Sequence, residues 1–495
     1  MSRHDASRRE FLRHAAMLSG AAGAAAAPLA LNLMAMSTAA AQTSDYRAIV
    51  CLFLFGGNDA ANMVLATDTE SWAQYVSARQ RDPDPLALRP AGTPPNDAAV
   101  AGSPDALGGI LPISPANGVS SAQNVGRTFA LHPSMSAVQG LFASGRLSIV
   151  ANVGPLVEPI AHRDEFRIRR RPPQIESHND QQYLWQALAA EGARTGWGGR
   201  LGDMLASRNS NTLFTNISAS GNAVFLAGQQ TFQYQVSGNN GATAIGGLTG
   251  QLFGSSAAAQ NFEKLIRGEG SQHLIARDYA AITGRSIDAQ AAFSEAFNAT
   301  ASRVPPPDGY LNPQNRQVAN NGLATQLRTV LRTMAAREQL GTRRQIFFVS
   351  IGGFDTHDFQ NGNHARLMAQ ISHALGYFDE QVTALGLRDN VTLFTASDFG
   401  RTFDSNGNGT DHAWGAHHFV YGGAGLRGGQ IFGRFPEYGF RHADSYGNRG
   451  NWIPQIAVDQ FGATLGRWFG VGDSDLNRIF PNLGNFERRN LGIYG

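Results

Sequence analysis

Three aspartates follow three separate apolar runs of the sequence, each across a short turn that contains glycine or serine. The runs are residues 49–55 before Asp59, 346–349 before Asp355 and 391–394 before Asp398. Because they are almost continuously apolar, they are typical of strands that are buried on both faces of a parallel sheet. In open α/β sheets ligands bind outside the carboxyl ends of the strands, so we expect the three carboxylates to converge.

Two histidines add nitrogen ligands to these carboxylates. His357 stands two residues after Asp355, and His412 follows a glycine-rich turn. Carboxylate oxygen and imidazole nitrogen bind divalent cations, so Asp59, Asp355, His357, Asp398 and His412 predict a metal site, with zinc, manganese, magnesium and calcium all open. A lone aspartate after a strand is more often a turn former or a helix cap. The prediction therefore depends on the threefold recurrence of the arrangement.

Ser177 and Arg401 are the candidate catalytic residues. Ser177 precedes a helix-like segment, whose N-terminal amides, with a metal, could stabilise a serine alkoxide. An N-cap serine is the competing interpretation. Arg401, just past the third aspartate, could hold an anionic substrate oxygen or could be a surface arginine. We expect one of His417 and His418 to face the site, and the role of His178 stays open.

Composition and charge narrow the class of protein. With 42% hydrophobic and 16% charged residues, the 495-residue chain is typical of a globular protein with a sizeable core. Residues 1–41 carry four arginines and two acidic residues, and without them the basic and acidic totals are both 36. A neutral body without a basic stripe argues against nucleic acid as a partner.

The first 41 residues have the ordered parts of a twin-arginine signal peptide. These parts are the pair Arg8–Arg9, the alanine-rich stretch 15–35 and the alanines 39–41. We expect the twin-arginine translocase to export the folded protein, and a mature chain to begin near Gln42 in the periplasm or outside the cell. An uncleaved anchor is the alternative, but alanine and glycine gain little on transfer into a membrane. No later stretch is apolar and long enough to span one.

The mature chain, residues 42–495, has the organisation of one α/β domain. Alternating strands, loops and helices predict a doubly wound, mostly parallel sheet with helices on both faces. Residues 229–307 are rich in glycine, alanine, asparagine and serine, which indicates a loop-rich and partly helical insertion or cap. A helix is predicted over residues 321–340, because leucine, valine and methionine recur on one of its faces.

Five short motifs occur along the chain at residues 55–59 (Phe-Gly-Gly-Asn-Asp), 130–133 (Ala-Leu-His-Pro), 352–357 (Gly-Gly-Phe-Asp-Thr-His), 397–402 (Ser-Asp-Phe-Gly-Arg-Thr) and 409–412 (Gly-Thr-Asp-His). In this order they resemble the motifs of domain-of-unknown-function family 1501, a group of exported bacterial proteins in the alkaline-phosphatase-like superfamily. The resemblance implies an α/β core that carries one or two divalent metals beside a serine or threonine nucleophile. It places Ser177 where the nucleophile is expected, and it implies that Asp355 and His357 are the aspartate-histidine pair of one metal and Asp398 an aspartate of the other. Asp59 then resembles the metal aspartate of the first strand, and His412 the late histidine.

Two departures from the superfamily pattern bear on function. Phe399 stands where the superfamily usually has a histidine after Asp398, and Cys51 lacks the C-x-P-x-R sequence of formylglycine sulfatases. We therefore expect an exported metal-dependent hydrolase of phosphate or sulfate esters, acting on a small molecule or a glycan through Ser177. The alternatives are a non-catalytic binding protein that retains the scaffold, which Phe399 favours, and an enzyme that modifies surface glycans.

Overall fold

The structure, a computed structural model, describes residues 45–116, 121–237, 241–242, 244–248, 250–268 and 273–495. The predicted signal peptide, residues 1–41, lies outside the described residues. The chain divides into two units, Met1–Tyr46 and Arg47–Gly495, and every element below belongs to the second unit.

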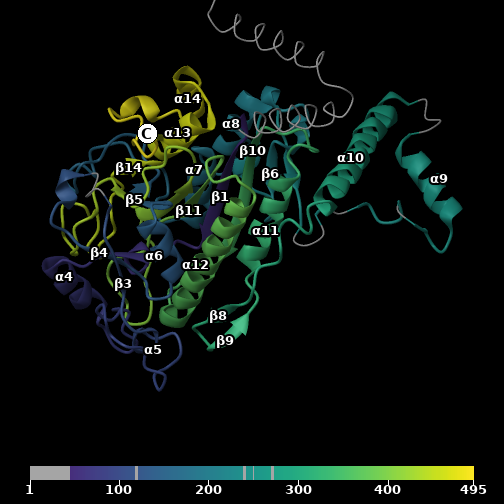
Figure 1. Ribbon diagram of the computed structural model, residues 1–495. Coiled ribbons are helices and arrows are strands. Elements are labelled where there is room, and N and C mark those ends of the chain that lie inside the picture. Colours follow the sequence, from purple (N-terminus) through teal and green to yellow (C-terminus); the bar gives the residue numbers. More distant parts are fainter. Residues whose placement is uncertain (1–44, 117–120, 238–240, 243, 249, 269–272) are drawn as a thin grey trace, which may run out of the picture. The chain divides into compact units, whose positions relative to one another are not determined.

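A nine-stranded sheet forms the centre of the second unit in the described part of the chain (Figure 1). Eight strands lie side by side, and a ninth, β14 (Ile456–Ala457), pairs with β5. In spatial order the eight are β13 (Ile431–Phe432), β5 (Leu147–Gly154), β12 (Ala416–Gly422), β11 (Val391–Ser397), β1 (Arg47–Phe55), β10 (Arg344–Gly352), β6 (Asn216–Ser218) and β7 (Gln233–Gln235).

The three strands that carry the predicted site are adjacent and parallel. β1 lies between β10 and β11, with Phe55 opposite Gly352 and Leu54 opposite Ser397. The three carboxyl ends therefore lie at one edge of the sheet, as the apolar runs predicted. β12 is antiparallel to β11 and to β5, so the sheet is mostly, not wholly, parallel.

Helices cover both faces of this sheet, as predicted. Ile49, Cys51 and Phe53 point to one face and share an apolar core with α8 (Trp197–Leu205) and α13 (Val458–Phe469). Alternate side chains of a strand point to the opposite face, where α11 (Gly322–Ala335) and α12 (Gln360–Ala384) lie (Figure 1). The Cys51 thiol is a buried member of the core, and burial raises its pKa.

The remaining described elements are short strands and helices around the sheet. A second sheet joins β2 (Val64–Ala66), β4 (Phe129–Leu131) and β3 (Leu111–Ile113), and a hairpin joins β8 (Tyr310–Asn312) and β9 (Gln317–Ala319). The other α-helices are α3 (Ala60–Met63), α4 (Thr69–Arg79), α5 (Pro104–Leu107), α6 (Ser136–Ala143), α7 (His178–Ala187), α9 (Ser256–Ile266), α10 (Leu274–Asn298) and α14 (Asp473–Ile479). The 3₁₀ turns are η1 (Ala122–Asn124), η2 (Ala206–Arg208), η3 (Thr212–Phe214), η4 (Val224–Leu226) and η6 (Leu483–Asn485). None of the described helices has both the length and the hydropathy of a membrane span.

The predicted insertion, residues 229–307, begins inside the sheet. β7 pairs in parallel with β6, so residues 233–235 add an edge strand before α9 and α10. The sequence of β7 is Gln-Tyr-Gln, which has no apolar run, so sequence alone gave no reason to expect a strand there.

Candidate functional site

The loops that follow β1 and β10 approach each other closely. Gly56 has a φ of +114°, and a Cβ at this position would lie 2.4 Å from the backbone nitrogen of Asp355. Only glycine fits such an approach at such a φ. The Gly56 N–H also donates to Asp398 Oδ2 at 3.2 Å. The ends of β1, β10 and β11 thus hold Asp355 and Asp398 at the same edge of the sheet.

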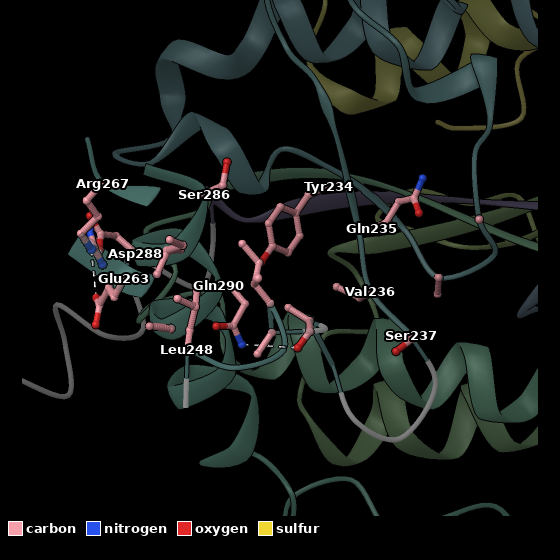
Figure 2. Close-up of a pocket in the computed structure, with 17 residues that line it drawn as sticks. Tyr234, Gln235, Val236, Ser237, Leu248, Glu263, Arg267, Ser286, Asp288 and Gln290 are labelled. Carbon is pink, nitrogen blue, oxygen red and sulfur yellow. Dashed lines mark hydrogen bonds and ion pairs between the residues drawn. The ribbon is translucent and has the colours of Figure 1, made fainter. Parts of the chain in front are cut away.

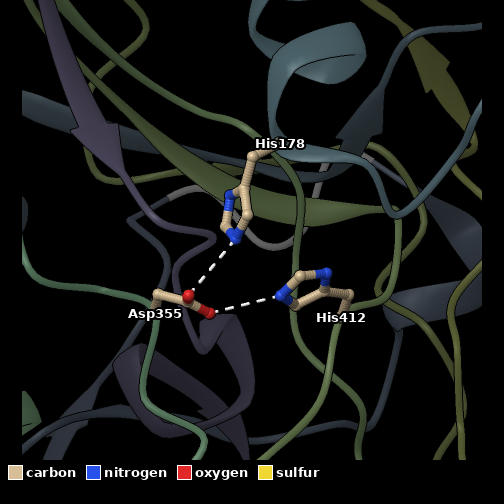
Figure 3. Close-up of side chains that lie close together, drawn as sticks. All are labelled: His178, Asp355 and His412. Carbon is tan, nitrogen blue, oxygen red and sulfur yellow. Dashed lines mark hydrogen bonds and ion pairs between the residues drawn. The ribbon is translucent and has the colours of Figure 1, made fainter.

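His178, Asp355 and His412 lie together at this edge (Figure 3). Each offers one possible metal-ligand atom, and these atoms lie within 4.8 Å of one another. Nε2 of His178 is 3.4 Å from Asp355 Oδ2, and Nε2 of His412 is 3.2 Å from Oδ1. His357 Nε2 lies 3.0 Å from Asp355 Oδ1 and 3.0 Å from His412 Nε2. Three imidazoles therefore surround one carboxylate, and we call these four residues the His₃Asp group.

The second nitrogen of each imidazole is held by an oxygen. The acceptors are Asp398 Oδ2 for His178 at 2.7 Å, Asp411 Oδ1 for His357 at 2.9 Å and the Glu176 carbonyl for His412 at 2.7 Å. Because these oxygens accept hydrogen bonds, each Nδ1 carries the proton, and in a neutral ring Nε2 keeps its lone pair. The lone pairs of His357 and His412 then face each other and the Asp355 oxygens. Such an arrangement is repulsive unless a metal ion or a proton lies among them.

The surroundings favour the protonation states that metal ligands need. Burial lowers the pKa of both His357 and His412, and the charge of Arg401 lowers each further. Burial acts to raise the pKa of Asp355, but the hydrogen bond and the charge of Arg401 outweigh it, so this pKa is lowered. At neutral pH His357 and His412 thus offer neutral imidazoles and Asp355 an ionised carboxylate, which are the metal-binding forms of these side chains.

Asp398, a predicted ligand, lies behind His178 rather than within the group. Its Oδ2 accepts hydrogen bonds from His178 Nδ1 and from Gln182 Nε2 at 2.9 Å. Its Oδ1 is buried and has no hydrogen-bond partner among the described residues. The hydrogen bond to Asp398 raises the pKa of His178. A carboxylate that orients a histidine in this way is common around bound metals.

Asp59, another predicted ligand, is not brought into the His₃Asp group. Its two carboxylate oxygens accept from Arg79 Nη1 and Nη2 at 2.5 and 2.9 Å, and both side chains are completely buried. Gln360 Nε2 donates to the same carboxylate at 2.5 Å. Asp59 and Arg79 therefore form a buried ion pair in this structure.

Arg401 is buried, with 2% of its surface exposed, and its donors point into the protein. Nη1 donates to Asp355 Oδ1 at 2.9 Å and to the Gly56 carbonyl at 3.0 Å, and Nε donates to Thr410 Oγ1 at 3.0 Å. Arg401 therefore orients Asp355 and links it to the neighbouring loops. Its predicted role in holding a substrate oxygen is not supported by this arrangement.

Ser177 is the N-cap residue of α7, the helix whose first residue is His178. Its side chain makes no capping hydrogen bond to the helix backbone, and Oγ donates to Asp180 Oδ2 at 2.8 Å. The competing interpretation, a plain capping serine, therefore does not hold for the side chain. A half-buried hydroxyl that is paired with a carboxylate is compatible with the predicted nucleophile, which stays a prediction.

Phe399 packs into the space beside the group. Its ring centroid lies 4.8 Å from that of His178 and 4.5 Å from that of His412. A Cβ on Gly57 would come within 2.3 Å of the Phe399 ring. An apolar ring thus occupies the place where the superfamily pattern led us to look for a histidine ligand.

Sequence reasoning missed three residues of this site: His178 as a member of the His₃Asp group, and Asp411 and Glu176 as the acceptors behind His357 and His412. Asp411 directly precedes His412 and His178 directly follows Ser177, so adjacency was the available signal for both. His417 and His418 lie outside the group: both are completely buried, and their rings pack on Phe435 and Trp185 at centroid distances of 4.3 and 4.7 Å.

A cavity of about 750 Å³ lies elsewhere, beside β7, α9 and α10 (Figure 2). Its walls include Tyr234, Leu248 and Gln290, and it shares no residue with the His₃Asp group. Its charged lining residues are Glu263, Arg267 and Asp288, and Arg267 pairs with both carboxylates at 2.9 Å.

A family model described as "Protein of unknown function (DUF1501)" matches residues 46–450. The chain belongs to the DUF1501 family. The family resemblance predicted from the short motifs is thus confirmed. No curated protein sequence matches the DUF1501 chain.

Solved structures similar to the DUF1501 chain include three enzymes. The first is a lipoteichoic acid synthase from Listeria monocytogenes, at 8% identity and a TM-score of 0.32, with 87% of this chain and 74% of that chain covered. The second is a sulfatase from Pseudoalteromonas sp., at 8% identity and a TM-score of 0.34, with 88% of this chain and 70% of that chain covered. The third is a phosphonate monoester hydrolase from Silicibacter pomeroyi, at 8% identity and a TM-score of 0.29, with 68% of each chain covered. Likeness at this level does not reach individual side chains, so the chemistry has to come from the site itself.

Proposed function

We propose that this DUF1501 chain is an exported, metal-dependent hydrolase of phosphate or sulfate esters. The observation that carries the proposal is the His₃Asp group, in which three Nε2 atoms converge on one carboxylate while every Nδ1 is held by an oxygen. Side chains of the group are 24% to 45% exposed, so a substrate can reach them.

The donor set suits a borderline divalent cation. His178, His412 and Asp355, whose ligand atoms lie within 4.8 Å of one another, would hold it, with His357 beside Asp355 and His412 as a further imidazole. Imidazole-rich sets favour zinc or manganese over the oxygen-preferring magnesium and calcium. Such a cation, when bound, supplies Lewis-acid polarisation of an ester oxygen. We propose one ion per chain, since Asp59 is neutralised by Arg79 and Phe399 offers no donor atom.

The chain's own residues would carry the remaining steps. Ser177 Oγ attacks phosphorus or sulfur, a bond from Oγ to that atom forms, and the bond to the leaving alcohol oxygen breaks. The hydroxyl proton passes to Asp180, whose Oδ2 accepts it at 2.8 Å. The leaving alcohol takes a proton from solvent. Water then hydrolyses the ester on Ser177 and releases phosphate or sulfate. Throughout, Arg401 keeps Asp355 ionised and in place.

The substrate would be an ester on a small molecule or a glycan outside the cytoplasm. This part of the proposal rests on the twin arginines and the small-residue cleavage pattern of residues 1–41. Recognition by the twin-arginine translocase would deliver the folded protein to the periplasm or the exterior.

A metal-binding protein without hydrolytic activity is the second candidate. Two observations favour it: Phe399 fills the space beside the group, and Arg401 points its donors into the protein. Both leave the metal site intact and remove groups that would bind a transferred anion. The two candidates therefore share the metal and differ in turnover.

The test combines metal analysis with an ester screen on the purified mature chain. We expect about one zinc or manganese ion per chain by elemental analysis, and hydrolysis of p-nitrophenyl phosphate or p-nitrophenyl sulfate that a chelator abolishes. His412→Ala should lose both. Metal in the wild type with no turnover on either ester supports the binding protein, and a wild type that binds no divalent metal refutes the proposal.

A further inference from the structure

We infer that Glu176 is a positioning residue, which fixes the ring nitrogen that His412 presents to the His₃Asp group. The inference rests on the proposed metal site. The Glu176 carbonyl accepts from His412 Nδ1 at 2.7 Å. Because a carbonyl can only accept, this contact keeps the proton on Nδ1 and the lone pair on Nε2. Nε2 is the atom that faces Asp355, at 3.2 Å.

The backbone must be turned to make this contact. Glu176 has a φ of +78°, in the left-handed region that side chains with a Cβ rarely adopt. Gln174, two residues earlier, is also left-handed, with a φ of +47°. Strained residues of this kind persist only where their surroundings hold them. The segment that leads into α7 is therefore held by something outside its own backbone.

The Glu176 carboxylate provides that hold. Oε1 accepts from the Tyr446 hydroxyl and from Asn451 Nδ2, the latter at 3.0 Å. Asn451 Nδ2 also lies 3.3 Å from the carbonyl of His412, so one amide ties both partners of the contact. Tyr446 is itself fixed, because its ring stacks on Phe166 with centroids 4.5 Å apart.

A glutamate is needed here for its carboxylate and not for the turn. Glycine would adopt this φ without strain, so a turn alone would not call for a side chain. In the glutamate, two hydrogen bonds to the carboxylate offset the unfavourable φ and hold the carbonyl in its orientation toward His412. Through that carbonyl it acts on a ring that faces the group, as residues behind metal ligands do.

Two variants separate this role from general stability. Glu176→Gln keeps an oxygen that accepts the same two hydrogen bonds, and it should bind Zn²⁺ within about threefold of wild type. Glu176→Gly relieves the strain but removes the anchor, and should weaken Zn²⁺ binding by about 10–100-fold. Both affinities come from competition with a chromophoric chelator, and the melting temperature of each metal-free chain shows whether it is folded. Val330→Ala, in the buried face of α11, is the matched control, which should lower the melting temperature and leave the affinity unchanged.

The His412 tautomer gives a readout that needs no metal. In metal-free protein labelled with ¹⁵N-histidine, the His412 signals are identified by their loss in His412→Ala. Wild type should show the Nδ1–H form, and Glu176→Gly a mixture with the Nε2–H form. An unchanged tautomer in Glu176→Gly overturns the inference, as does unchanged Zn²⁺ affinity. A wild type that binds no Zn²⁺ refutes the proposed function alone, because the tautomer still decides the role of Glu176.

Discussion

Replacing Arg79 by methionine should destabilise the protein strongly. Arg79 and Asp59 are both completely buried and are joined by two hydrogen bonds, at 2.5 and 2.9 Å. Methionine keeps much of the apolar volume but has no donor. The Asp59 carboxylate would then stay buried with Gln360 as its remaining side-chain donor. Removing one partner of a buried ion pair lowers the free energy of unfolding by about 3–5 kcal/mol.

The loss should depend on pH in a defined direction. In the wild type burial acts to raise the pKa of Asp59, but Arg79 outweighs it, so this pKa is lowered. The stabilisation by the pair is therefore present above the unfolded pKa of about 3.9 and is lost as pH falls. Without Arg79, burial raises the pKa of Asp59. The deficit of Arg79→Met should consequently be larger at pH 8 than at pH 5.

Urea unfolding, followed by tryptophan fluorescence and circular dichroism at both pH values, measures the deficit. Arg89→Met is the matched control, because the Arg89–Asp105 pair has side chains that are 33% and 52% exposed. An exposed pair contributes at most about 1 kcal/mol. Asp59→Asn and the double variant with Arg79→Met complete a cycle, which should show the two residues to be coupled.

Two results would refute this reasoning. The first is an Arg79→Met deficit no larger than that of Arg89→Met, which would mean that the buried pair contributes little. The second is an Asp59→Asn variant that unfolds like wild type but loses its metal. That outcome would return Asp59 to the ligand role that its place after β1 predicted.

The remaining predictions concern the site, the core and export. His412→Ala should lower Zn²⁺ affinity by at least about 10-fold in chelator competition, and unchanged affinity would remove this residue from the ligand set. Ser177→Ala should abolish ester hydrolysis while metal content stays, and full turnover would instead indicate direct attack by water. Burial raises the pKa of Asp459 from 3.8 to about 6. This shift corresponds to at most about 3 kcal/mol of folding stability, which is present below the unfolded pKa and is lost as pH rises through 6. Asp459→Asn should therefore raise the free energy of urea unfolding at pH 7.5 and change it little at pH 4; equal effects at both would contradict this. Lysine at both Arg8 and Arg9 should trap the precursor in the cytoplasm on cell fractionation, and normal export of this variant would exclude the twin-arginine route.

The buried strands and the amphipathic helix could be predicted from the sequence, because each depends on a pattern within its own residues. β1, β10 and β11 are buried on both faces along most of their length, so apolar residues follow one another in each instead of alternating with polar ones. The helix predicted over residues 321–340 begins at Gly322, with Asn321 as its N-cap, and ends earlier, at Ala335. Its start was visible as an asparagine before the apolar pattern. Its end was not, because helix-favouring residues continue past it.

Short polar strands were not readable, because their neighbours define them. β6 and β7 have only three residues each, and β7 is a partly exposed edge strand. The pairing of each to the strand beside it, and not its own sequence, makes it a strand. For this reason the predicted insertion begins at residue 229, before β7, although β7 is part of the sheet.

The same limit applies to the site, where identical local signals have different outcomes. Asp59 and Asp355 each follow a buried parallel strand and a glycine turn, and the sequence around them predicts the same role. Asp59 meets Arg79, which α4 places beside it from twenty residues further along the chain. Asp355 meets three imidazoles, whose proton positions are set by oxygens from three other segments. Whether a carboxylate after a strand lies in a buried ion pair or among imidazoles thus depends on which side chains the fold brings to it. That choice is made by tertiary contacts and leaves no mark on the carboxylate's own neighbours in sequence.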